Sequence, residues 1–414
     1  MSEMSYLEKL LDGVEVEWKT LEDISIKISS GGTPKTGVSE FYDGDIPWLR
    51  TQEVNFCDIW DTEVKITESG VKNSSAKWIP KNCVIVAMYG ATVGKIGINK
   101  IPMTTNQACA NIQLNEEVAH YRYVFHFLCS QYTYIKSLGT GSQTNINAQI
   151  VKNIKIPIPC PDNPEKSLAI QSEIVRILDK FTALTVELTA ELAMRKKQYN
   201  YYRDQLLSFE EGEVEWKTLG DIGDVRMCKR ILKNETLPEG DVPFYKIGTF
   251  GKKANAFISR DVFEAYKNKY SFPKKGDVLI SASGTIGRTV IYDGEPAYFQ
   301  DSNIVWLEND ESIVTNKYLW HFYKIAKWAV SEGGTIDRLY NDNIRKTKII
   351  VPYPSDPSKS LAEQNRVVAI LEKFDALTSS ISEGLPREIE LRQKQYEYYR
   401  DLLFSFPKPE AASN

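Results

Sequence analysis

The segment with the closest approach to a catalytic or nucleotide-binding motif is the glycine-rich turn GATVGK at residues 90–95. Glycine-rich loops that end in lysine hold phosphates when they have the spacing GxxxxGK followed by Ser or Thr. Here the spacing is one residue short, and Ile96 stands where the hydroxyl is needed. A turn that presents Thr92 and Lys95 to a partner is therefore the better interpretation.

The acidic and metal-binding residues do not form an enzyme site either. Asp162, Glu165 and Lys166 resemble nuclease residues only weakly, and they stand at a proline-rich helix start, where acids favour the helix dipole. The six cysteines have no paired spacing and, with the three histidines, offer no zinc pattern. His126 and His321 lie in aromatic segments and are expected in the core. The tetrapeptides with which amino-methyltransferases hold a flipped base are missing, so we expect no catalytic residue, metal or cofactor in this chain.

Basic residues are concentrated in one part of the chain. The 414 residues carry a net charge of -4, but residues 225–288 hold 13 Lys or Arg against six Asp or Glu, a balance of +7. Such a patch fits a surface that meets phosphates, and a solvated lysine-rich surface fits as well. With 42% hydrophobic and 26% charged residues, no leader-like start and no apolar run of membrane length, we expect a reduced cytoplasmic protein of several domains.

The chain contains one long helical segment twice. KSLAIQSEIVRILDKFTALT at 166–185 returns as KSLAEQNRVVAILEKFDALT at 359–378, and QYNYYRDQLLSF at 198–209 returns as QYEYYRDLLFSF at 395–406. Apolar residues in steps of three and four predict a coiled-coil seam in each copy. A tandem tetrapeptide, TVEL–TAEL at 185–192, adds a stutter of one turn. The predicted seam consists of Ile170, Ile174, Ile177, Phe181, Leu184, Leu188, Leu192, Val367, Ile370, Phe374, Leu377 and Ile381.

Two globular segments alternate with these helices. They share short turn motifs, but the rest of their sequences differs. GDIPWLR (44–50) matches GDVPFYK (240–246), TVGK (92–95) matches TIGR (285–288), and Gln107 is aligned with Gln300. GVEVEWKTL near the N-terminus returns as EGEVEWKTL at 211–219, so the repeat is circular. We predict an α+β protein with two globular domains of similar fold, joined by two long antiparallel helices that form a coiled coil with pseudo-twofold symmetry. The second helix is expected to kink at Gly384 and Pro386.

With these features in view, the chain resembles the specificity subunit of type I restriction-modification enzymes, and within it the IC subfamily. The resemblance covers essentially the whole chain and is strongest in MSEMSYLEKLLDGVEVEW, in the helix with the tetrapeptide repeat and in QKQYEYYRDLLFSF. It divides the chain into an N-terminal segment that packs with the C-terminal helix region (1–17), target-recognition domain 1 (18–161), a central helix for spacing and docking (162–212), target-recognition domain 2 (213–354), a C-terminal helix (355–407) and a tail (408–414).

The resemblance also implies a function. Each globular domain would read one half of a split, asymmetric DNA site, and the helices would set the unread spacer. The helices would also dock two modification subunits, which bind S-adenosylmethionine and methylate adenine, while two motor-nuclease subunits that use ATP and Mg complete the restriction complex. By itself this chain would be non-catalytic and would bind double-stranded DNA.

Base reading needs polar side chains on loops, and phosphates are held by Lys, Arg and backbone N–H groups. The predicted DNA-binding residues of the first domain are Gly32, Thr33, Lys35, Arg50, Gln52, Tyr89, Thr92, Lys95, Asn106, Gln107, Gln143, Asn145 and Asn147. Those of the second are Lys229, Arg230, Lys246, Ser283, Thr285, Arg288, Gln300, Arg338 and Tyr340. We expect Gly90, Gly94, Gly284 and Gly287 to shape the backbone rather than to touch a ligand.

The repeated helix ends are the candidates for partner docking, and a purely structural role fits them equally. The residues are Arg195, Lys196, Tyr199, Tyr202, Arg203, Tyr396, Tyr399 and Arg400. A rival hypothesis makes the chain a protein–protein scaffold whose two unlike domains bind proteins. The two hypotheses differ in whether DNA binding is sequence-specific and weakens with salt.

Overall fold

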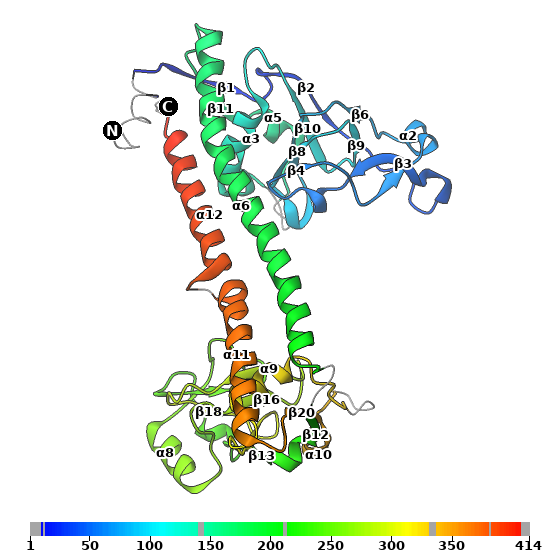
Figure 1. Cartoon of the computed structure of the whole chain (residues 1–414). Helices are drawn as coiled ribbons and strands as arrows, with labels where there is room; N and C mark the ends of the chain where they lie inside the picture. Colours follow the sequence, from blue (N-terminus) through cyan, green and yellow to red (C-terminus); the bar gives the residue numbers. More distant parts are fainter. Residues whose placement is uncertain are drawn as a thin grey trace. The chain divides into compact units, whose positions relative to one another are not determined.

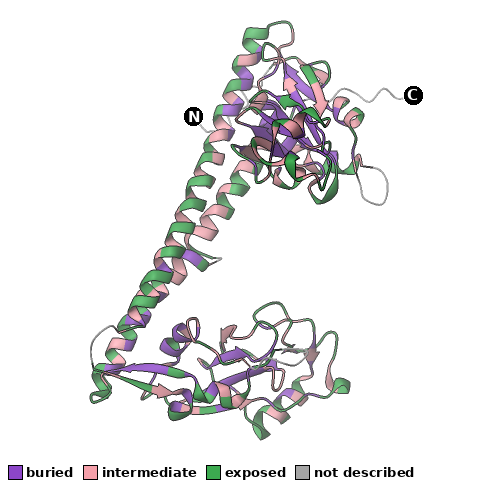
Figure 2. Ribbon diagram, turned by 90° about the vertical axis from the view of Figure 1, so that its right-hand side faces the viewer, coloured by how far each residue is buried: buried purple, intermediate pink, exposed green. Residues whose placement is uncertain are grey.

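The computed structural model describes residue 10 and residues 13–139, 145–209, 213–330, 337–380 and 382–406. It contains two compact units: unit 1 comprises Met1–Leu188 and Glu388–Asn414, and unit 2 comprises Thr189–Arg387. Each unit combines β-sheets with helices (Figure 1), which confirms the predicted α+β class. Buried residues are gathered inside the globular part of each unit (Figure 2).

Unit 1 is built on three small sheets. Strand β1 (Val16–Thr20) pairs antiparallel with β11 (Lys155–Pro159). A five-stranded sheet has the order β2 (Ser25–Ser30), β10 (Cys109–Leu114), β7 (Val84–Ala87), β8 (Ile96–Asn99) and β4 (Cys57–Ile59). A four-stranded sheet has the order β5 (Lys65–Ile66), β3 (Tyr42–Leu49), β9 (Met103–Thr105) and β6 (Trp78–Ile79).

The helices of unit 1 pack against its two larger sheets, and the first of them contacts β3 of the four-stranded sheet. They are α2 (Glu68–Lys72), α3 (Tyr121–Ser130), α4 (Tyr132–Ser137) and α5 (Ala148–Lys152). Helix α3 is aromatic along its buried face, and the Tyr123 hydroxyl donates to the Pro157 carbonyl at 2.7 Å. Leu10 and Val14 from the start of the chain and Phe404 and Phe406 from its end belong to this same core. The two ends of the chain therefore contribute to one folded unit.

Unit 2 repeats this plan. Strand β12 (Val214–Thr218) pairs with β20 (Lys348–Pro352) in the register of β1 and β11. The larger sheet has the order β13 (Gly223–Met227), β19 (Ile304–Asn309), β16 (Val278–Ser281) and β17 (Thr289–Ile291). The smaller sheet has the order β15 (Phe257–Ile258), β14 (Val242–Tyr245) and β18 (Tyr298–Phe299). Its helices are α7 (Leu219–Ile222), α8 (Arg260–Lys269), α9 (Asn316–Tyr323) and α10 (Asn341–Lys346).

Matching hydrogen bonds prove that the two units are one fold. Gln171 donates to the Val118 carbonyl and accepts from the His120 N–H; Gln364 does the same with Ile313 and Thr315. The prediction of two domains of similar fold is confirmed. One detail of the sequence alignment was wrong. The backbone N–H groups of Asn106 and Gln300 bond to equivalent strand ends, so Asn106, rather than Gln107, is the counterpart of Gln300.

The first long helix is continuous and the second is broken. Helix α6 (Pro164–Leu206) has 43 residues, or about 64 Å at 1.5 Å per residue. The second copy forms α11 (Pro357–Ser379) and α12 (Gly384–Leu403). Gly384 has φ +77°, and a Cβ there would lie 2.4 Å from the Ala376 carbonyl oxygen. The expected kink is thus a break between two helices, because only glycine fits this backbone.

Antiparallel packing of the helices is visible within each unit. In unit 1 the Phe181 ring of α6 stacks on Tyr399 of α12 at 5.2 Å, and in unit 2 Tyr202 of α6 stacks on Phe374 of α11 at 5.8 Å. Of the predicted seam, Ile170, Ile174 and Val367 are buried; Ile177, Phe181, Leu184, Leu188, Leu192, Ile370, Phe374 and Leu377 are half-buried; Ile381 lies outside the described residues.

Each helix has a second apolar face that the periodicity of the sequence did not predict. Val175, Leu178, Val368 and Leu371 are buried, although none of them belongs to the predicted seam. They pack into the globular core of their unit. The first part of each helix therefore has two apolar faces, one for the other helix and one for the domain.

Candidate nucleic-acid interface

Two glycine turns at matching places carry several of the predicted reading residues. In unit 1 the turn from Tyr89 to Lys95 links β7 to β8, and in unit 2 the turn from Ser283 to Arg288 links β16 to β17. Gly90, Gly94, Gly284 and Gly287 all have φ between 67° and 81°. The prediction that these glycines shape the backbone is confirmed, because this conformation is strained for other residues.

Each turn lies beside a second predicted segment. The Gly90 N–H donates to the Asn145 side chain at 3.3 Å, and the Ile146 N–H donates to the Met88 carbonyl. In unit 2, Ser283 forms a β-bridge with Arg338. Asn147 caps α5 through its side chain, whereas Tyr340 precedes α10 and is 55% exposed. Gln143 lies outside the described residues.

A third group in unit 1 surrounds the end of β9. The Gly32 N–H donates to the Thr105 carbonyl at 2.9 Å, and the Thr33 hydroxyl donates to the Gln107 side chain. Thr33 and Gln107 are exposed, and Asn106 is half-buried. The tertiary structure thus brings residues 32–33 and 106–107 together. Lys35 is exposed further along the same loop.

Two of the predicted contact residues are buried within the chain. Gly32 is buried, and a Cβ there would lie 2.4 Å from the Ser75 carbonyl carbon, so this glycine allows a close chain crossing. Ser283 is 5% exposed, and its hydroxyl donates to the Asn303 side chain at 2.7 Å. Both residues help to hold the loops in place, and their contact with DNA stays a prediction.

Two of the predicted cations of unit 1 are held by neighbouring side chains. Arg50 pairs with Glu63 at 2.6 Å, and the Lys95 ammonium donates to Asn55 at 2.8 Å. A phosphate would have to replace the carboxylate beside Arg50. Asn55 and Glu63 were not predicted from the sequence, because only the tertiary structure brings them to the cations. Gln52 is exposed beside Arg50, and Thr92 is half-buried in its turn.

The cations of unit 2 are more open. Lys229 and Lys246 are exposed and lie over the rings of Tyr270 and Phe244. Arg230 pairs with Asp301 at 2.9 Å, while its side chain stays 69% exposed. Two further cations and two uncharged candidates remain. Thr285 and Arg338 are exposed, Arg288 donates to the Phe250 carbonyl at 3.1 Å, and the Gln300 side chain accepts from the Ile247 N–H at 2.9 Å.

A partly buried polar cluster joins α3 to the long helices in unit 1. The Asp179 carboxylate of α6 accepts from Arg122 at 2.6 and 2.8 Å and contacts His126 Nε2 at 2.7 Å. The other His126 nitrogen, Nδ1, bonds to the Tyr396 hydroxyl at 2.9 Å. Burial lowers the pKa of His126, and the pKa of Asp179 is also lowered, since the bonds from His126 and Arg122 outweigh burial.

The matching place in unit 2 is held differently. Lys317 and Glu372 form an exposed pair at 2.7 Å, where unit 1 has Arg122 and Asp179. Lys324 contacts Asp375 at 2.8 Å and the Tyr199 hydroxyl at 2.9 Å. His321 is buried, and its two ring nitrogens have no hydrogen-bond partner among the described residues. Burial and the Lys324 charge lower the pKa of His321 to about 3.

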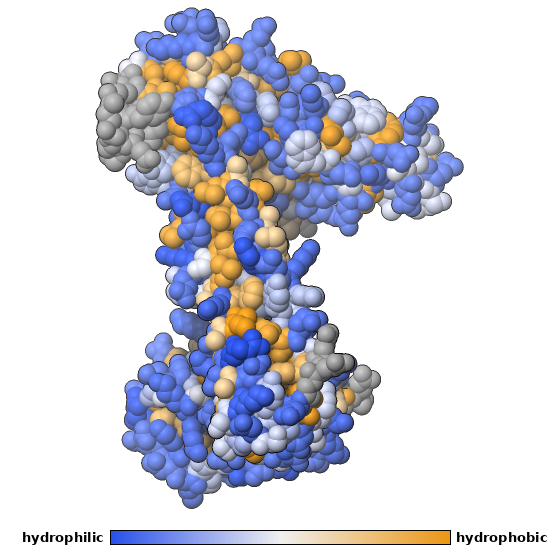
Figure 3. Space-filling model, in the orientation of Figure 1, coloured by the Kyte–Doolittle hydropathy of each residue, from blue (hydrophilic) through white to orange (hydrophobic). Residues whose placement is uncertain are grey.

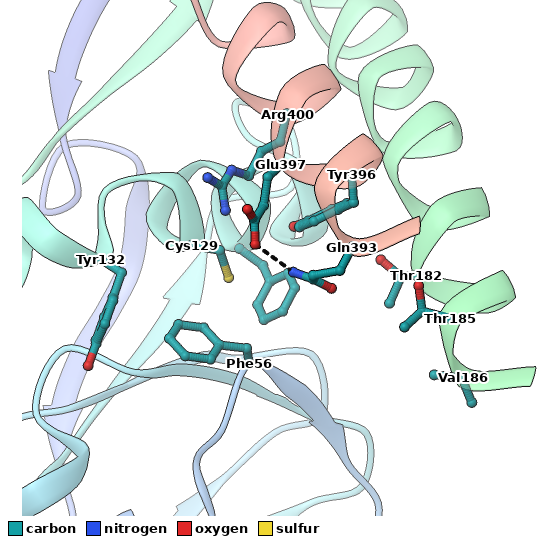
Figure 4. Close-up of a pocket in the computed structure, with 11 residues that line it drawn as sticks. Phe56, Cys129, Tyr132, Thr182, Thr185, Val186, Gln393, Tyr396, Glu397 and Arg400 are labelled. Atoms are coloured by element: carbon teal, nitrogen blue, oxygen red, sulfur yellow. Dashed lines mark hydrogen bonds between the residues drawn. The ribbon is translucent and has the colours of Figure 1, made fainter. Parts of the chain in front are cut away.

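The predicted docking residues are mostly used inside their own unit. The hydroxyls of Tyr199 and Tyr396 form hydrogen bonds with Lys324 and His126, respectively. Tyr202 stacks on Phe374, and Tyr399 stacks on Phe181. Arg203 and Arg400 each lie over the tyrosine ring four residues earlier, that of Tyr199 or Tyr396, and pair with the next aspartate. Arg195 pairs with Glu191, and Lys196 is exposed. Tyr396 and Arg400 also line a pocket of about 420 Å³ beside Phe56, Tyr132 and Val186 (Figure 4).

The described residues include no group of three or more His, Cys, Asp or Glu side chains arranged to hold a metal ion. None of the described helices is long and apolar enough to cross a membrane. Two similar α+β domains with exposed polar turns, joined by repeated helices, define the class of a two-domain recognition protein.

Comparisons with known proteins name this class. The family model for the type I restriction modification DNA specificity domain matches residues 13–194 and again residues 211–391. A putative type I restriction enzyme specificity subunit of Haemophilus influenzae is 47% identical over 97% of this chain and 98% of its own length. The specificity subunit of a type I restriction enzyme of Escherichia coli is 40% identical over the full length of both chains.

A solved structure shows the same fold. The crystal structure of the type I restriction-modification system S subunit from M. genitalium covers 96% of this chain with a TM-score of 0.57 at 16% identity. The chain therefore belongs to the family of type I restriction-modification specificity subunits. Its role is DNA sequence specificity, and it is a non-catalytic part of its complex. The rival hypothesis of a pure protein–protein scaffold is not favoured.

Proposed function

We propose that each globular unit reads one half of a bipartite, asymmetric DNA site through its glycine turn and the segments beside it. The observation that carries this proposal is the repetition of one scaffold with different residues on its turns. Both units present a turn between matching strands, with a second polar segment next to it. Two readouts on one scaffold suit a target with two different half-sites.

The long helices would set the unread spacer between the half-sites and dock two methyltransferase subunits. Exposed apolar residues support the docking: Val186, Met194, Tyr201, Tyr202, Leu391 and Tyr398 are each at least 38% exposed on α6 and α12. Figure 3 shows apolar surface gathered along these helices. An exposed apolar surface on helices marks a protein interface.

The partners would supply the chemistry. The modification subunits would bind S-adenosylmethionine and methylate adenine, and two motor-nuclease subunits would use ATP and Mg in the cytoplasm. The tandem tetrapeptide TVEL–TAEL at 185–192 supports membership of the IC subfamily, in which its copy number would tune the spacer.

A binding experiment tests the proposal. The chain is purified with its cognate modification subunits and titrated with labelled duplexes over a range of salt. We expect sequence-specific binding that weakens steeply with salt, because phosphate contacts release counterions. The exposed cations Lys246 and Arg338 should each reduce the salt slope by about one when replaced by Ala, if each contacts one phosphate. Binding that ignores sequence would overturn the proposal.

A second experiment tests the spacer. Inserting one more TAEL after Leu192 adds one helical turn, about 6 Å, or one to two base-pair rises of about 3.4 Å each. We expect methylation mapping to show a longer unread gap with both half-sites unchanged. New half-sites would contradict the idea that the helices act as a ruler.

A further inference from the structure

Unit 2 contains a large pocket that the DNA-reading role does not use. Its volume is about 740 Å³, and it lies between the end of α6, strands β12 and β20, and the segment that follows α9. Its floor is apolar and is formed by Leu207, Trp216, Phe322, Ile325 and Ile350. Trp216 is 59% exposed, which is unusual for the largest apolar side chain.

The matching place in unit 1 is closed by the chain itself. Strands β1 and β12 have the same sequence, VEWKT, and the same register against their partners. In unit 1, Trp18 packs edge-on against Phe127 at 6.0 Å, and Phe404 packs against Phe127 at 5.4 Å. Helix α4 follows α3 there. In unit 2, Leu207 stands in place of Phe404, and residues 324–330 form no regular structure.

The rim of the unit 2 pocket is basic. Among the residues that the structure describes, five cations line it, namely Arg203, Lys324, Lys327, Lys346 and Lys348, against the single acid Asp204. Arg203 pairs with Asp204, and Lys324 pairs with Asp375. The other three lysines are exposed and form no ion pair within the described parts of the chain. An excess of positive charge on a chain of net charge -4 selects an acidic ligand.

Taken together, these features favour a protein segment over DNA. A duplex needs exposed cations and gains nothing from an apolar floor of this size, whereas a peptide anchor fills such a pocket. The pocket is also built from the repeated helix end and from β12 and β20, and not from the turns after β14, β16 and β18 that carry the reading residues. In unit 1 the chain's own Phe404 ring packs at the matching position.

We infer that this pocket docks a segment of the modification subunit that presents an aromatic or large aliphatic side chain flanked by Asp or Glu. The inference rests on the proposed docking of such subunits and specifies the chemistry of one contact. The anchor would cover Trp216 between Leu207 and Phe322, and its acidic neighbours would pair with Lys327, Lys346 and Lys348.

The first test uses cross-linking in the assembled complex. The photoreactive residue p-benzoylphenylalanine replaces Trp216, and as a control it replaces Trp78, which is 52% exposed in unit 1. We expect the residue at 216 to cross-link the modification subunit within an acidic stretch, identified by mass spectrometry, at a yield about tenfold above the control. Cross-linking to DNA alone, or a yield equal to that at position 78, overturns the inference.

The second test changes the charge of the rim. The variant K327E/K346E/K348E should weaken modification-subunit binding, measured without DNA, by about tenfold or more. The matched control is K155E, because Lys155 has the register in β11 that Lys348 has in β20. Trp216→Ala should weaken the same binding without charge reversal, and its exposure leaves the fold intact. Unchanged subunit binding with weaker DNA binding would assign the pocket to DNA instead.

These outcomes are separable from a failure of the proposed function. If the unaltered complex assembles and binds its DNA site while both variants assemble as well as it does, the proposed function stands and the pocket inference fails. If the unaltered complex shows no sequence-specific DNA binding, the proposed function itself fails.

Discussion

In both units the globular domain packs against the long helices through apolar residues. The polar side chains at this contact differ between unit 1 and unit 2. Both units place a histidine of an aromatic helix in the core, His126 in α3 and His321 in α9, and both are fully buried. In unit 1 both nitrogens of that histidine are hydrogen-bonded, whereas in unit 2 neither nitrogen has a hydrogen-bond partner in the described part of the chain. The comparison teaches that the same buried residue type can have two roles: His321 fills space in the core of unit 2, whereas His126 also makes hydrogen bonds in unit 1.

The carboxylate of α6 makes the difference. Asp179 is short enough to reach both Arg122 and His126, and Glu372, at the matching position, pairs with Lys317 in an exposed place instead. Unit 2 compensates with Lys324, which ties Asp375 to Tyr199. Unit 1 has Cys129 and Thr182 at these positions, and both line its pocket of about 420 Å³. The charged side chains Lys324 and Asp375 of unit 2 thus stand where unit 1 has its pocket. In the same way, Phe404 of unit 1 stands where Leu207 lines the pocket of unit 2.

The largest expected effect comes from the carboxylates. Asp179→Ala should destabilise unit 1 by about 3 kcal/mol, because it removes two charged hydrogen bonds from Arg122, which keeps only Asp58, and leaves the buried His126 Nε2 unbonded. The matched change Glu372→Ala should cost unit 2 less than about 1 kcal/mol, since that pair is exposed. Amide hydrogen exchange of the central strands gives the opening free energy of each unit separately. Equal losses in the two units would contradict the comparison.

Replacement of the histidines should come next. His126→Phe removes a partner from Asp179 and from the Tyr396 hydroxyl, and should cost unit 1 about 2 kcal/mol at pH 7.5. His321→Phe should leave unit 2 within about 0.5 kcal/mol or stabilise it, because no hydrogen bond of the ring is lost. The same exchange measurement checks both, and a large loss for His321→Phe would show that the ring has a partner.

Lowering the pH should weaken unit 2. The pKa of His321 is about 3 in the folded chain and about 6.5 when unfolded, so the unfolded state binds the extra proton between these values. Asp375 lies 3.8 Å from Nδ1 but is tied to Lys324, and burial dominates. Stability is full above about pH 6.5 and falls below it, by about 2 kcal/mol at pH 5. Exchange at pH 7.5 and pH 5 measures this, and His321→Phe should remove the loss.

The smallest effect concerns the ring that closes unit 1. Phe404→Leu, which copies Leu207 of unit 2, removes the ring contacts with Tyr123 and Phe127 and should cost unit 1 about 1 kcal/mol. Trp216→Ala in unit 2 should change the stability by less than about 0.5 kcal/mol, because that side chain is 59% exposed. A loss of more than about 1 kcal/mol at Trp216 would mean that the open pocket is a packed part of the core.

The amino-acid sequence by itself determined the repeat, the α+β class, the helix seam and the family. These properties depend on local periodicity and on long matching stretches such as VEWKT and QYxYYRD, which a linear reading can see. It also placed Gly90, Gly94, Gly284 and Gly287 in turns, since their role depends only on the local backbone.

Only the tertiary structure decided which side chains are available. Gly32 and Ser283 are buried by residues 43 and 20 positions away, and Arg50 is held by Glu63, 13 positions along the chain. Val175 and Leu178 turned out to be core residues because a domain, and not only a helix, packs on α6. The different exposure of Trp18 and Trp216 in identical strands has the same origin. Burial and pairing depend on what the folded chain brings to a residue from far away, which the local pattern does not contain.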